Sequence, residues 1–168
     1  MPDDAGSRFE MARAELADLD DVVLVLEEAS AWLRSRGIHQ WPAKFSADWI
    51  GPSIRRGETW LATVGGHLAG TITLSSVDPA WPDDAGDAAY VHRLAVRRGS
   101  PGRGRALLDW AAATAQAQHR SLLRLDCVSS NVRLRRYYEE AGFQPRGEAS
   151  IHGATVTLFE RPTERTTA

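Results

Sequence analysis

SLLRLDCVSSNVRLRRYYEEAGF, residues 121–143, is the stretch that decides the fold class of this chain. Its first part carries the apolar residues of a buried strand, which are Leu122, Leu123, Leu125 and Val128. Asn131 (or Ser130) then offers a side-chain cap for a helix, and Gly142 supplies the residue type that commonly ends one. The stretch therefore predicts a buried strand followed directly by a helix.

The residues before this stretch predict a second strand and helix. Residues 88–96 have the composition of a strand, and a glycine-containing turn follows at 97–104. An Ala/Leu-rich helix then runs to about His119. Together with the strand at 122–128, these segments predict a β-α-β unit in the middle of the chain.

The first half of the chain predicts a mixture of helices and antiparallel strands. We expect a short strand at 8–14 and a helix that begins with Asp18 as its N-cap and ends near Arg36, before Gly37. A weaker helix is expected from Ser46, with Gly51 and Pro52 interrupting its pattern. Strands at 58–64 and 67–76 are joined by a Gly-Gly pair that suits a two-residue hairpin turn, and a loop follows at 77–87.

Strands at 143–149 and 154–161 complete the expected order. The fold class is therefore α/β (α+β), with a mixed, mostly antiparallel central sheet flanked by helices. With 168 residues, the chain has the length of one domain. We expect a single domain over 1–168, with residues 1–7 and 162–168 as loose tails.

Composition excludes several classes of protein. No apolar run approaches the length that spans a bilayer, and the first residues lack the pattern of a secretory signal. The lone Cys127 excludes an internal disulfide framework and a multi-cysteine metal site, and it suits a reducing compartment. We therefore expect a cytoplasmic protein without membrane segments and without a metal.

The small net charge of −2 conceals a strong separation of charge along the chain. Residues 1–92 carry seven basic and fifteen acidic side chains, whereas residues 93–136 carry ten arginines and two aspartates. Residues 137–168 carry three arginines and five glutamates. The basic middle suggests an anionic ligand, and the acidic first half permits a cationic one.

The turn at residues 97–106, RRGSPGRGRA, has the composition of a phosphate-binding site. It leads into a helix, whose first backbone N–H groups are unpaired and attract anions. The turn lacks the Gly-Lys-Ser/Thr of an NTPase loop, and Leu107 stands where a dinucleotide fingerprint has its third glycine. An ordinary glycine-rich connection is the alternative interpretation.

The chain resembles the GNAT superfamily of acetyl-CoA-dependent N-acetyltransferases, over nearly its whole length in the order of elements and through specific motifs in about residues 90–143. The resemblance rests on Leu94-Ala-Val96, on the glycine-rich turn, and on an Asn that opens a helix containing Tyr-x-x-x-Gly-Phe. In this chain those residues are Asn131, Tyr138, Gly142 and Phe143. The resemblance implies a GNAT-like sheet, acetyl-CoA as the co-substrate and no metal. The family pattern for this turn is Gln/Arg-x-x-Gly-x-Gly/Ala, and it can be aligned with residues 99–104 or 101–106. This chain departs from the pattern, because neither alignment offers the leading Gln or Arg.

The resemblance also implies roles for individual residues. The strand segment Leu94, Ala95 and Val96 should pair with pantetheine, which Asn131 should also contact. The pyrophosphate should lie against the backbone amides of Gly102, Arg103, Gly104, Arg105 and Ala106. Tyr138 should be the general acid that protonates the departing thiolate; its neighbour Tyr137 is expected in the core.

His92 is the candidate general base. It stands two residues before Leu94, where some family members carry a glutamate, and strand alternation would place it on one face with Leu94 and Val96. An imidazole, with an ordinary pKa near 6.5, suits a base at neutral pH. A half-buried strand histidine that only donates a hydrogen bond is the alternative.

The acceptor pocket should be formed by the first helix, the loop after it and the loop before His92. These segments carry Trp32, Trp41 and Trp81, with acidic residues nearby that suit an ammonium group: Glu28, Asp83, Asp84 and Asp87. Packing roles for the tryptophans and a solvated acidic loop are the alternatives.

Three classes of function can be considered for this sequence. The first is transfer of acetyl from acetyl-CoA to a primary amine of a small molecule or peptide, by direct attack in a ternary complex. The alternative is a non-catalytic acyl-CoA-binding sensor of the same fold. Nucleic-acid binding by the arginines lacks a recognisable reading helix, so we expect no nucleic-acid partner. The acceptor and the oligomeric state, a homodimer included, are left open.

Overall fold

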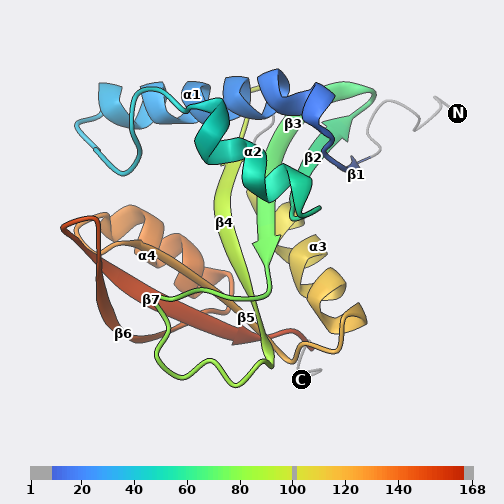
Figure 1. Cartoon of the computed structure of the whole chain (residues 1–168). Helices are drawn as coiled ribbons and strands as arrows, with labels where there is room; N and C mark the ends of the chain where they lie inside the picture. The colour runs from blue at the N-terminus through green and yellow to red at the C-terminus, as the bar shows by residue number, and fades with distance from the viewer. Residues whose placement is uncertain (1–8, 100–101, 165–168) are drawn as a thin grey trace, which may run out of the picture. The chain divides into compact units, whose positions relative to one another are not determined.

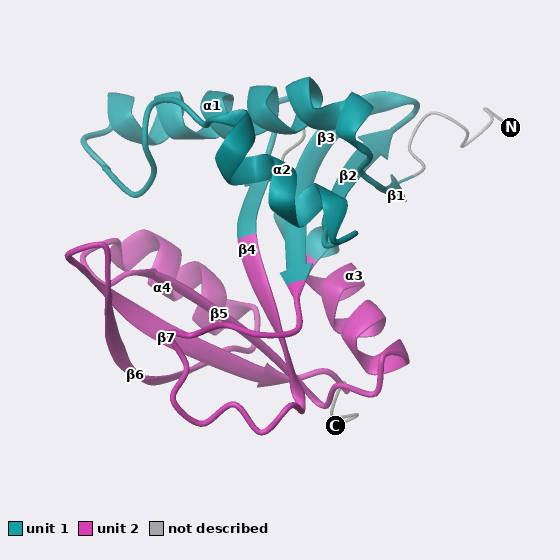
Figure 2. Cartoon of the chain, in the orientation of Figure 1, with its two compact units in different colours: residues 1–74, 93–107 teal, residues 75–92, 108–168 magenta. Residues whose placement is uncertain are grey.

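The computed structural model describes residues 9–99 and 102–164, and these residues cluster into two compact units (Figure 2). Unit 1 comprises residues 1–74 and 93–107, and unit 2 comprises residues 75–92 and 108–168. The strand β4 (Ala88–Val96) runs from unit 2 into unit 1.

Within the described residues, seven strands form one sheet (Figure 1). Their order across the sheet is β1 (Phe9–Arg13), β2 (Thr59–Val64), β3 (His67–Ser75), β4, β5 (Leu122–Val128), β7 (Ala154–Pro162) and β6 (Gln144–Ile151). The pairs β1/β2, β2/β3, β5/β7 and β6/β7 are antiparallel, and β4 pairs with β5 in parallel. The predicted mixed, mostly antiparallel α/β fold with a central β-α-β unit is confirmed.

Unit 1 begins with β1 (Phe9–Arg13), the 3-10 helix η2 (Leu16–Asp18), α1 (Leu19–Ser35) and α2 (Ala47–Arg55). Asp18 lies at the expected N-cap position of α1, but its carboxylate accepts a hydrogen bond from the Glu15 backbone N–H (2.8 Å). Gly37 follows the helix with a φ of +76°, a conformation that glycine adopts readily. The Ser46 hydroxyl caps α2, and the helix continues through Pro52 to Arg55.

The hairpin of β2 (Thr59–Val64) and β3 (His67–Ser75) completes the first part of unit 1. Gly65 and Gly66 both have positive φ, as the predicted two-residue turn requires. Beneath α1 and α2 lies an apolar cluster formed by Ala14, Val22, Val25, Leu26, Phe45, Ile50, Ile54, Leu61 and Ala95.

Unit 2 contains most of α3 (Arg103–Ala117), then β5 (Leu122–Val128), α4 (Val132–Glu140), β6 (Gln144–Ile151) and β7 (Ala154–Pro162). Consecutive residues are buried in the middle of β5, from Leu123 to Leu125, and of β7, from Val156 to Phe159, so both faces of these strands are covered there. The cluster beneath the loop before β4 consists of Trp81, Ala88, Tyr90, Val156 and Leu158.

The C-terminal tail expected over residues 162–168 begins later than predicted. Pro162 belongs to β7, and the buried Thr163 is held by hydrogen bonds to the carbonyls of Ser121 and Arg120, each 2.9 Å long. These two residues of the expected tail 162–168 are therefore part of the fold. Residues 1–7 and 165–168 lie outside the described residues, and a single domain over 1–168 stays a prediction.

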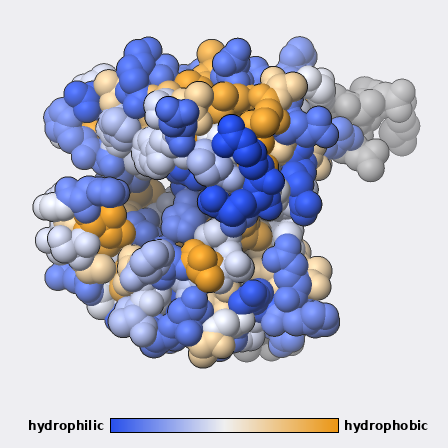
Figure 3. Space-filling model, in the orientation of Figure 1, coloured by the Kyte–Doolittle hydropathy of each residue, from blue (hydrophilic) through white to orange (hydrophobic). Residues whose placement is uncertain are grey.

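Most residues on the face drawn in Figure 3 are hydrophilic. Over the described ranges 9–99 and 102–164, no helix has both the length and the apolar composition that crossing a membrane requires.

Candidate active site

The strand β4 carries the residues expected to bind pantetheine. Ala95 is buried in the core of unit 1, whereas Leu94 and Val96 are half-buried. The described parallel pairing joins Ala88, Ala89 and Tyr90 to the first residues of β5, from Leu122 to Arg124. Leu94 and Val96 therefore lie beyond the part of β4 that is described as paired with β5.

A break in the regular strand geometry separates His92 from Leu94. Arg93 has a φ of +48°, in the left-handed region, which costs a non-glycine residue about 1–2 kcal/mol. The regular alternation that would place His92 on one face with Leu94 and Val96 is therefore interrupted at Arg93. Backbone strain of this kind is common at functional sites.

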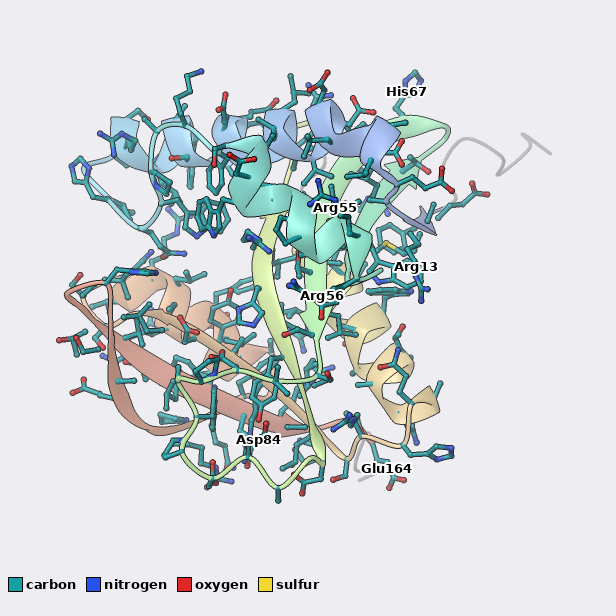
Figure 4. The ribbon with its side chains drawn as sticks, viewed as in Figure 1. Arg13, Arg55, Arg56, His67, Asp84 and Glu164 are labelled. Atoms are coloured by element: carbon teal, nitrogen blue, oxygen red, sulfur yellow. The ribbon has the colours of Figure 1, made fainter. Side chains whose placement is uncertain are left out.

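Contacts from α2 hold the Arg93 side chain. Its guanidinium donates a hydrogen bond to the Ser53 hydroxyl (3.1 Å) and lies 5.5 Å from the centre of the Trp49 ring. Burial, together with the charge of Arg56 (labelled in Figure 4), lowers the pKa of Arg93. A half-buried arginine thus stabilises the irregular conformation of β4 next to the candidate base.

His92 lies beside a buried carboxylate of its own unit. Its Nε2 is 3.7 Å from Oδ2 of Asp78, the first acidic residue of the loop before β4. The other Asp78 oxygen accepts a hydrogen bond from the Ala80 backbone N–H (2.9 Å), which fixes the orientation of the carboxylate. Asp78 was not predicted as a site residue, although an Asp in a loop often accepts a hydrogen bond from the backbone N–H two residues later.

A second acidic group, Asp126 on β5, completes this cluster. Burial, reinforced by the negative charge of Asp78, raises the pKa of Asp126 to about 6. Asp78 thus lies close enough to Asp126 to affect its ionisation and also lies beside His92. Asp126 was also missed, because it alternates with apolar residues in β5 and looks like any outward-facing strand position.

Tyr138 is buried at the end of α4 among aromatic rings. Its ring centre lies 5.9 Å from that of Phe143 and 6.0 Å from that of Phe159. Burial raises the pKa of Tyr138 well above that of a free phenol, so the hydroxyl stays protonated at neutral pH. Tyr137 is instead exposed, so its expected place in the core is wrong.

Cys127 lies in the same part of unit 2 as Tyr138. It is buried, and burial, with the charge of Asp126, raises the pKa of its thiol to about 12. The group therefore remains a thiol and packs as a small apolar residue, as the sequence predicts.

Asn131 occupies the N-cap position of α4. Its side-chain oxygen accepts a hydrogen bond from the Leu134 backbone N–H (3.1 Å), and the residue is 9% exposed. Gly142 follows the helix with a φ of +92°. The predicted cap and stop of α4 are both confirmed.

The turn expected to bind pyrophosphate is described on both sides of residues 100–101, which lie outside the described residues. Gly102 has a φ of +77°, and no described atom lies within 4 Å of where a Cβ would stand. The next four residues form the first turn of α3: Arg103, Gly104, Arg105 and Ala106. Arg105 is exposed and Arg103 is half-buried, so the surface at this helix N-terminus is basic.

Trp32, expected in the acceptor pocket, lies on α1 among arginines. The guanidinium carbons of Arg98 and Arg36 are 4.1 and 4.6 Å from the centre of its ring. One turn earlier on α1, Glu28 forms an ion pair with Arg97 (3.2 Å). Two residues expected near the acceptor thus contact Arg97 and Arg98. These arginines begin the turn at residues 97–106 that is predicted to bind phosphate, hereafter the phosphate turn.

Trp41 lies in the loop between α1 and α2. It packs on the apolar cluster of unit 1 and meets the Phe45 ring edge-on at 6.0 Å. The Ser30 hydroxyl donates a hydrogen bond to the Pro42 carbonyl (2.6 Å), which ties this loop to α1.

Trp81 is buried in unit 2, where it packs on Arg124. The Arg124 guanidinium lies 4.3 Å from the centre of the Trp81 ring and forms ion pairs with Glu160 (2.7 Å) and Asp83 (3.3 Å). Trp81 also borders a cavity of about 890 Å³, which is lined in part by the loop before β4. Asp84, labelled in Figure 4, belongs to this loop. Four carboxylates and two guanidinium groups line the cavity: Asp83, Asp87, Glu148, Glu160, Arg124 and Arg146.

The predicted site residues are thus divided between the two units. His92, Asn131, Tyr138 and Trp81 belong to unit 2, and the remaining predicted residues belong to unit 1. Within residues 9–99 and 102–164, no group of three or more His, Cys, Asp or Glu side chains has an arrangement that could hold a metal ion.

Comparisons with known proteins agree on one family. Residues 26–143 match the family model described as the acetyltransferase (GNAT) family. Over 164 residues the chain is 28% identical to the N-acetyltransferase YesJ of Bacillus subtilis (strain 168), covering 91% of this chain and 89% of that protein.

Solved structures show the same similarity. The crystal structure of a GNAT-family acetyltransferase from Listeria monocytogenes 4b F2365 superposes with a TM-score of 0.76 and 26% identity, covering 92% of this chain and 94% of that one. The structure of yncA from Salmonella typhimurium, which contains its cofactor acetyl-CoA, has a TM-score of 0.65 and 15% identity, with 96% and 98% coverage. The latter similarity shows the fold alone.

Proposed function

The chain belongs to the acetyltransferase (GNAT) family, and from that premise we propose that it transfers the acetyl group of acetyl-CoA to a primary amine of a small molecule or peptide in the cytoplasm. The amine attacks directly, with both substrates bound. The observation that carries the proposal is the pairing of His92 with the buried Asp78 beside a strained residue of β4.

The described residues fit coenzyme A. Leu94 and Val96 lie beyond the described pairing of β4 with β5, so their main-chain groups suit the amides of pantetheine. The open space at Gly102 leaves room for phosphate oxygens at the amides of the first turn of α3. Asn131 would contact the pantetheine arm. When bound, acetyl-CoA supplies a thioester whose C–S bond breaks as the C–N bond to the amine forms.

His92 would accept the proton that the attacking nitrogen loses, either directly or through one water molecule. Asp78 would stabilise the resulting imidazolium, because its negative charge lies 3.7 Å away. The imidazolium then returns its proton to solvent.

Tyr138 would deliver a proton to the departing sulfur and recover one from solvent. Its raised pKa makes this transfer less favourable than transfer from a free phenol, but it also keeps the donor fully protonated before the reaction. The proposal therefore requires Tyr138 as a hydrogen-bond donor to the developing thiolate and does not require a stable phenolate.

We further propose a cationic acceptor. Trp41 and Trp81 would contribute aromatic faces to the acceptor pocket, as the sequence predicts. The sequence places Trp32 in the same pocket. The excess of carboxylates over guanidinium groups around the cavity at Trp81 supports a positively charged amine over an acidic one.

The test is a thiol-release assay with acetyl-CoA and a panel of amines that includes diamines, amino acids and lysine-containing peptides. Stoichiometric release of CoA, with mass-spectrometric detection of the acetylated amine, is the expected result. Tight CoA binding without product for any amine would instead favour the acyl-CoA sensor. Absence of CoA binding would contradict both functions.

A further inference from the structure

We propose that Glu28 and Trp32 of α1 are positioning residues for the phosphate turn, and that they set the affinity for coenzyme A without contacting the acceptor amine. The inference rests on the proposed function, since it assumes that the turn after β4 binds the CoA pyrophosphate. The preceding residue, Glu27, holds the loop that carries Trp41 through hydrogen bonds of the same kind.

Glu28 uses both carboxylate oxygens to hold the beginning of the turn. Oε2 accepts a hydrogen bond from Arg97 Nε (3.2 Å) and lies 3.2 Å from the second guanidinium nitrogen of the same side chain. Oε1 accepts a hydrogen bond from the Arg98 backbone N–H (3.2 Å). Glu28 thus fixes a side chain and the main chain of two consecutive residues.

Two further contacts hold the same two residues. The Arg97 backbone N–H donates to the Ala69 carbonyl of β3 (2.8 Å), so the main chain leaves β4 in a defined direction. The Arg98 guanidinium lies over the Trp32 ring, where the cation–π attraction orients it. Arg98 is therefore held by its backbone and by its side chain, with both partners on α1.

This arrangement assigns the Trp32 ring to cations of the protein itself. Arg36 and Arg98 both lie within 4.6 Å of its centre. An acceptor ammonium at the ring would have to compete with two guanidinium groups. Trp32 therefore suits the support of the turn better than the recognition of a cationic amine.

Glu27 provides a matched contrast one residue earlier on the helix. It accepts hydrogen bonds from Lys44 Nζ (3.0 Å) and from the Phe45 backbone N–H (3.1 Å), and these bonds lower its pKa. Its side chain is 24% exposed and that of Glu28 is 31% exposed, so the two positions offer similar environments for substitution. The two carboxylates thus hold different segments. Glu28 holds the first residues of the phosphate turn, and Glu27 holds the loop that carries Trp41.

The decisive experiment compares Glu28→Gln with Glu27→Gln in the full-length protein. Coenzyme A binding is measured by titration calorimetry at 0.5 M NaCl, where exposed charges are screened. Glu28→Gln loses the carboxylate charge and keeps only one acceptor oxygen for two donors. This should weaken CoA binding by roughly five- to tenfold, whereas Glu27→Gln should bind CoA as the wild type does. Trp32→Leu should weaken CoA binding in the same direction.

Steady-state kinetics with the best amine provides the complementary readout. Glu28→Gln should raise the KM for acetyl-CoA and leave the KM for the amine unchanged, and Glu27→Gln should do the reverse. Melting temperatures of both variants show whether either substitution has unfolded the protein. Glu28→Ala, which keeps no acceptor oxygen, should have a larger effect than Glu28→Gln.

Three outcomes would overturn the inference. Equal CoA affinity of the wild type and Glu28→Gln would show that the turn needs no support from α1. Tighter CoA binding by Glu28→Gln would mean that Glu28 mainly neutralises Arg97. A raised amine KM in Trp32→Leu with normal CoA binding would show that Trp32 belongs to the acceptor pocket. Failure of the wild type to bind CoA would instead contradict the proposed function itself.

Discussion

At the scale of single residues, the proposed mechanism assigns the removal of the amine proton to His92, with Asp78 as its partner. We expect His92→Gln to lower kcat by roughly a hundredfold and to flatten the acid limb of the pH–rate profile, because the proposed proton acceptor is then absent. Asp78→Asn should lower kcat less and move the acid limb to lower pH, since the imidazolium loses a neighbouring negative charge. An unchanged profile in His92→Gln would remove His92 from the mechanism.

Tyr138 can be tested without disturbing the aromatic cluster around it. Tyr138→Phe removes only the hydroxyl and preserves the ring contacts with Phe143 and Phe159. We expect kcat to fall by roughly ten- to a hundredfold with little change in the dissociation constant of CoA. Tyr137→Phe is the matched control and should retain full activity. A fully active Tyr138→Phe would mean that solvent protonates the thiolate.

Asp126 should make folding stability depend on pH. Its pKa of about 6 lies above the ordinary value of 3.8, so the folded state binds the proton more tightly than the unfolded state. Its contribution is therefore fully present below about pH 4 and is lost as the pH rises through about 6. Asp126→Asn should be more stable than the wild type at pH 8 by about 1–2 kcal/mol, less than the full shift implies because the group is half-buried.

The measurement is denaturant unfolding of both proteins at pH 4, 6 and 8. Near pH 4 the two stabilities should converge, because the wild-type carboxyl is then protonated and resembles the amide. A stability difference that does not change with pH would show that Asp126 ionises normally in the folded protein.

At the scale of elements, the contact between β3 and the segment of β4 next to the phosphate turn depends on Gly70. A Cβ at this position would lie 2.7 Å from the Ala95 carbonyl oxygen and 3.2 Å from a methyl carbon of Leu107. We expect Gly70→Ala to lower the free energy of unfolding by about 1–3 kcal/mol and to weaken CoA binding, because the backbone at Ala95 must shift.

Gly51→Ala in α2 is the control for Gly70→Ala. A Cβ at Gly51 would lie 3.5 Å from its nearest neighbour, the flexible Arg55 side chain, and alanine favours a helix over glycine. This variant should be as stable as the wild type or more stable, with unchanged CoA binding. Thermal unfolding and calorimetry of both variants would check the pair, and a stable Gly70→Ala would show that β4 can shift without cost.

Most elements follow from local sequence, and so they could be predicted. Gly65 and Gly66 specify their turn through backbone conformation, and Asn131 specifies the start of α4 through a hydrogen bond three residues away. The left-handed Arg93 could not be predicted, because its conformation depends on α2, about 40 residues earlier. The continuation of α2 through Pro52 was also missed, since tertiary packing offset the poor local propensity.

The candidate site was only partly predictable for the same reason. His92 and Tyr138 were identified through a resemblance that depends on short motifs. Asp78 approaches His92 across a loop, and Glu28 approaches Arg97 from a helix 69 residues earlier in the chain. Side-chain neighbours of this kind are set by tertiary structure, and neither periodicity nor spacing along the chain encodes them.

At the scale of the whole molecule, the separation of charge along the chain predicts how salt affects each substrate. The segment with ten arginines and two aspartates contains the phosphate turn, α3 and the arginines of α4. The first 92 residues, with fifteen acidic side chains, include α1 and the loop that carries Trp81. CoA is a polyanion and the proposed acceptor is a cation, so each is attracted by a different part of the sequence.

Raising NaCl from about 0.02 to 0.5 M, which shortens the screening length several-fold, should therefore raise the KM for both acetyl-CoA and a diamine acceptor. The KM for an acidic amine such as glutamate should stay constant or fall, because salt screens its repulsion by the acidic half. Sucrose at the same osmolality is the control, since it leaves charge interactions unscreened. A KM for the diamine that is independent of salt would contradict a cationic acceptor. If the KM for acetyl-CoA depends on salt in the same series, the proposed CoA site is still supported.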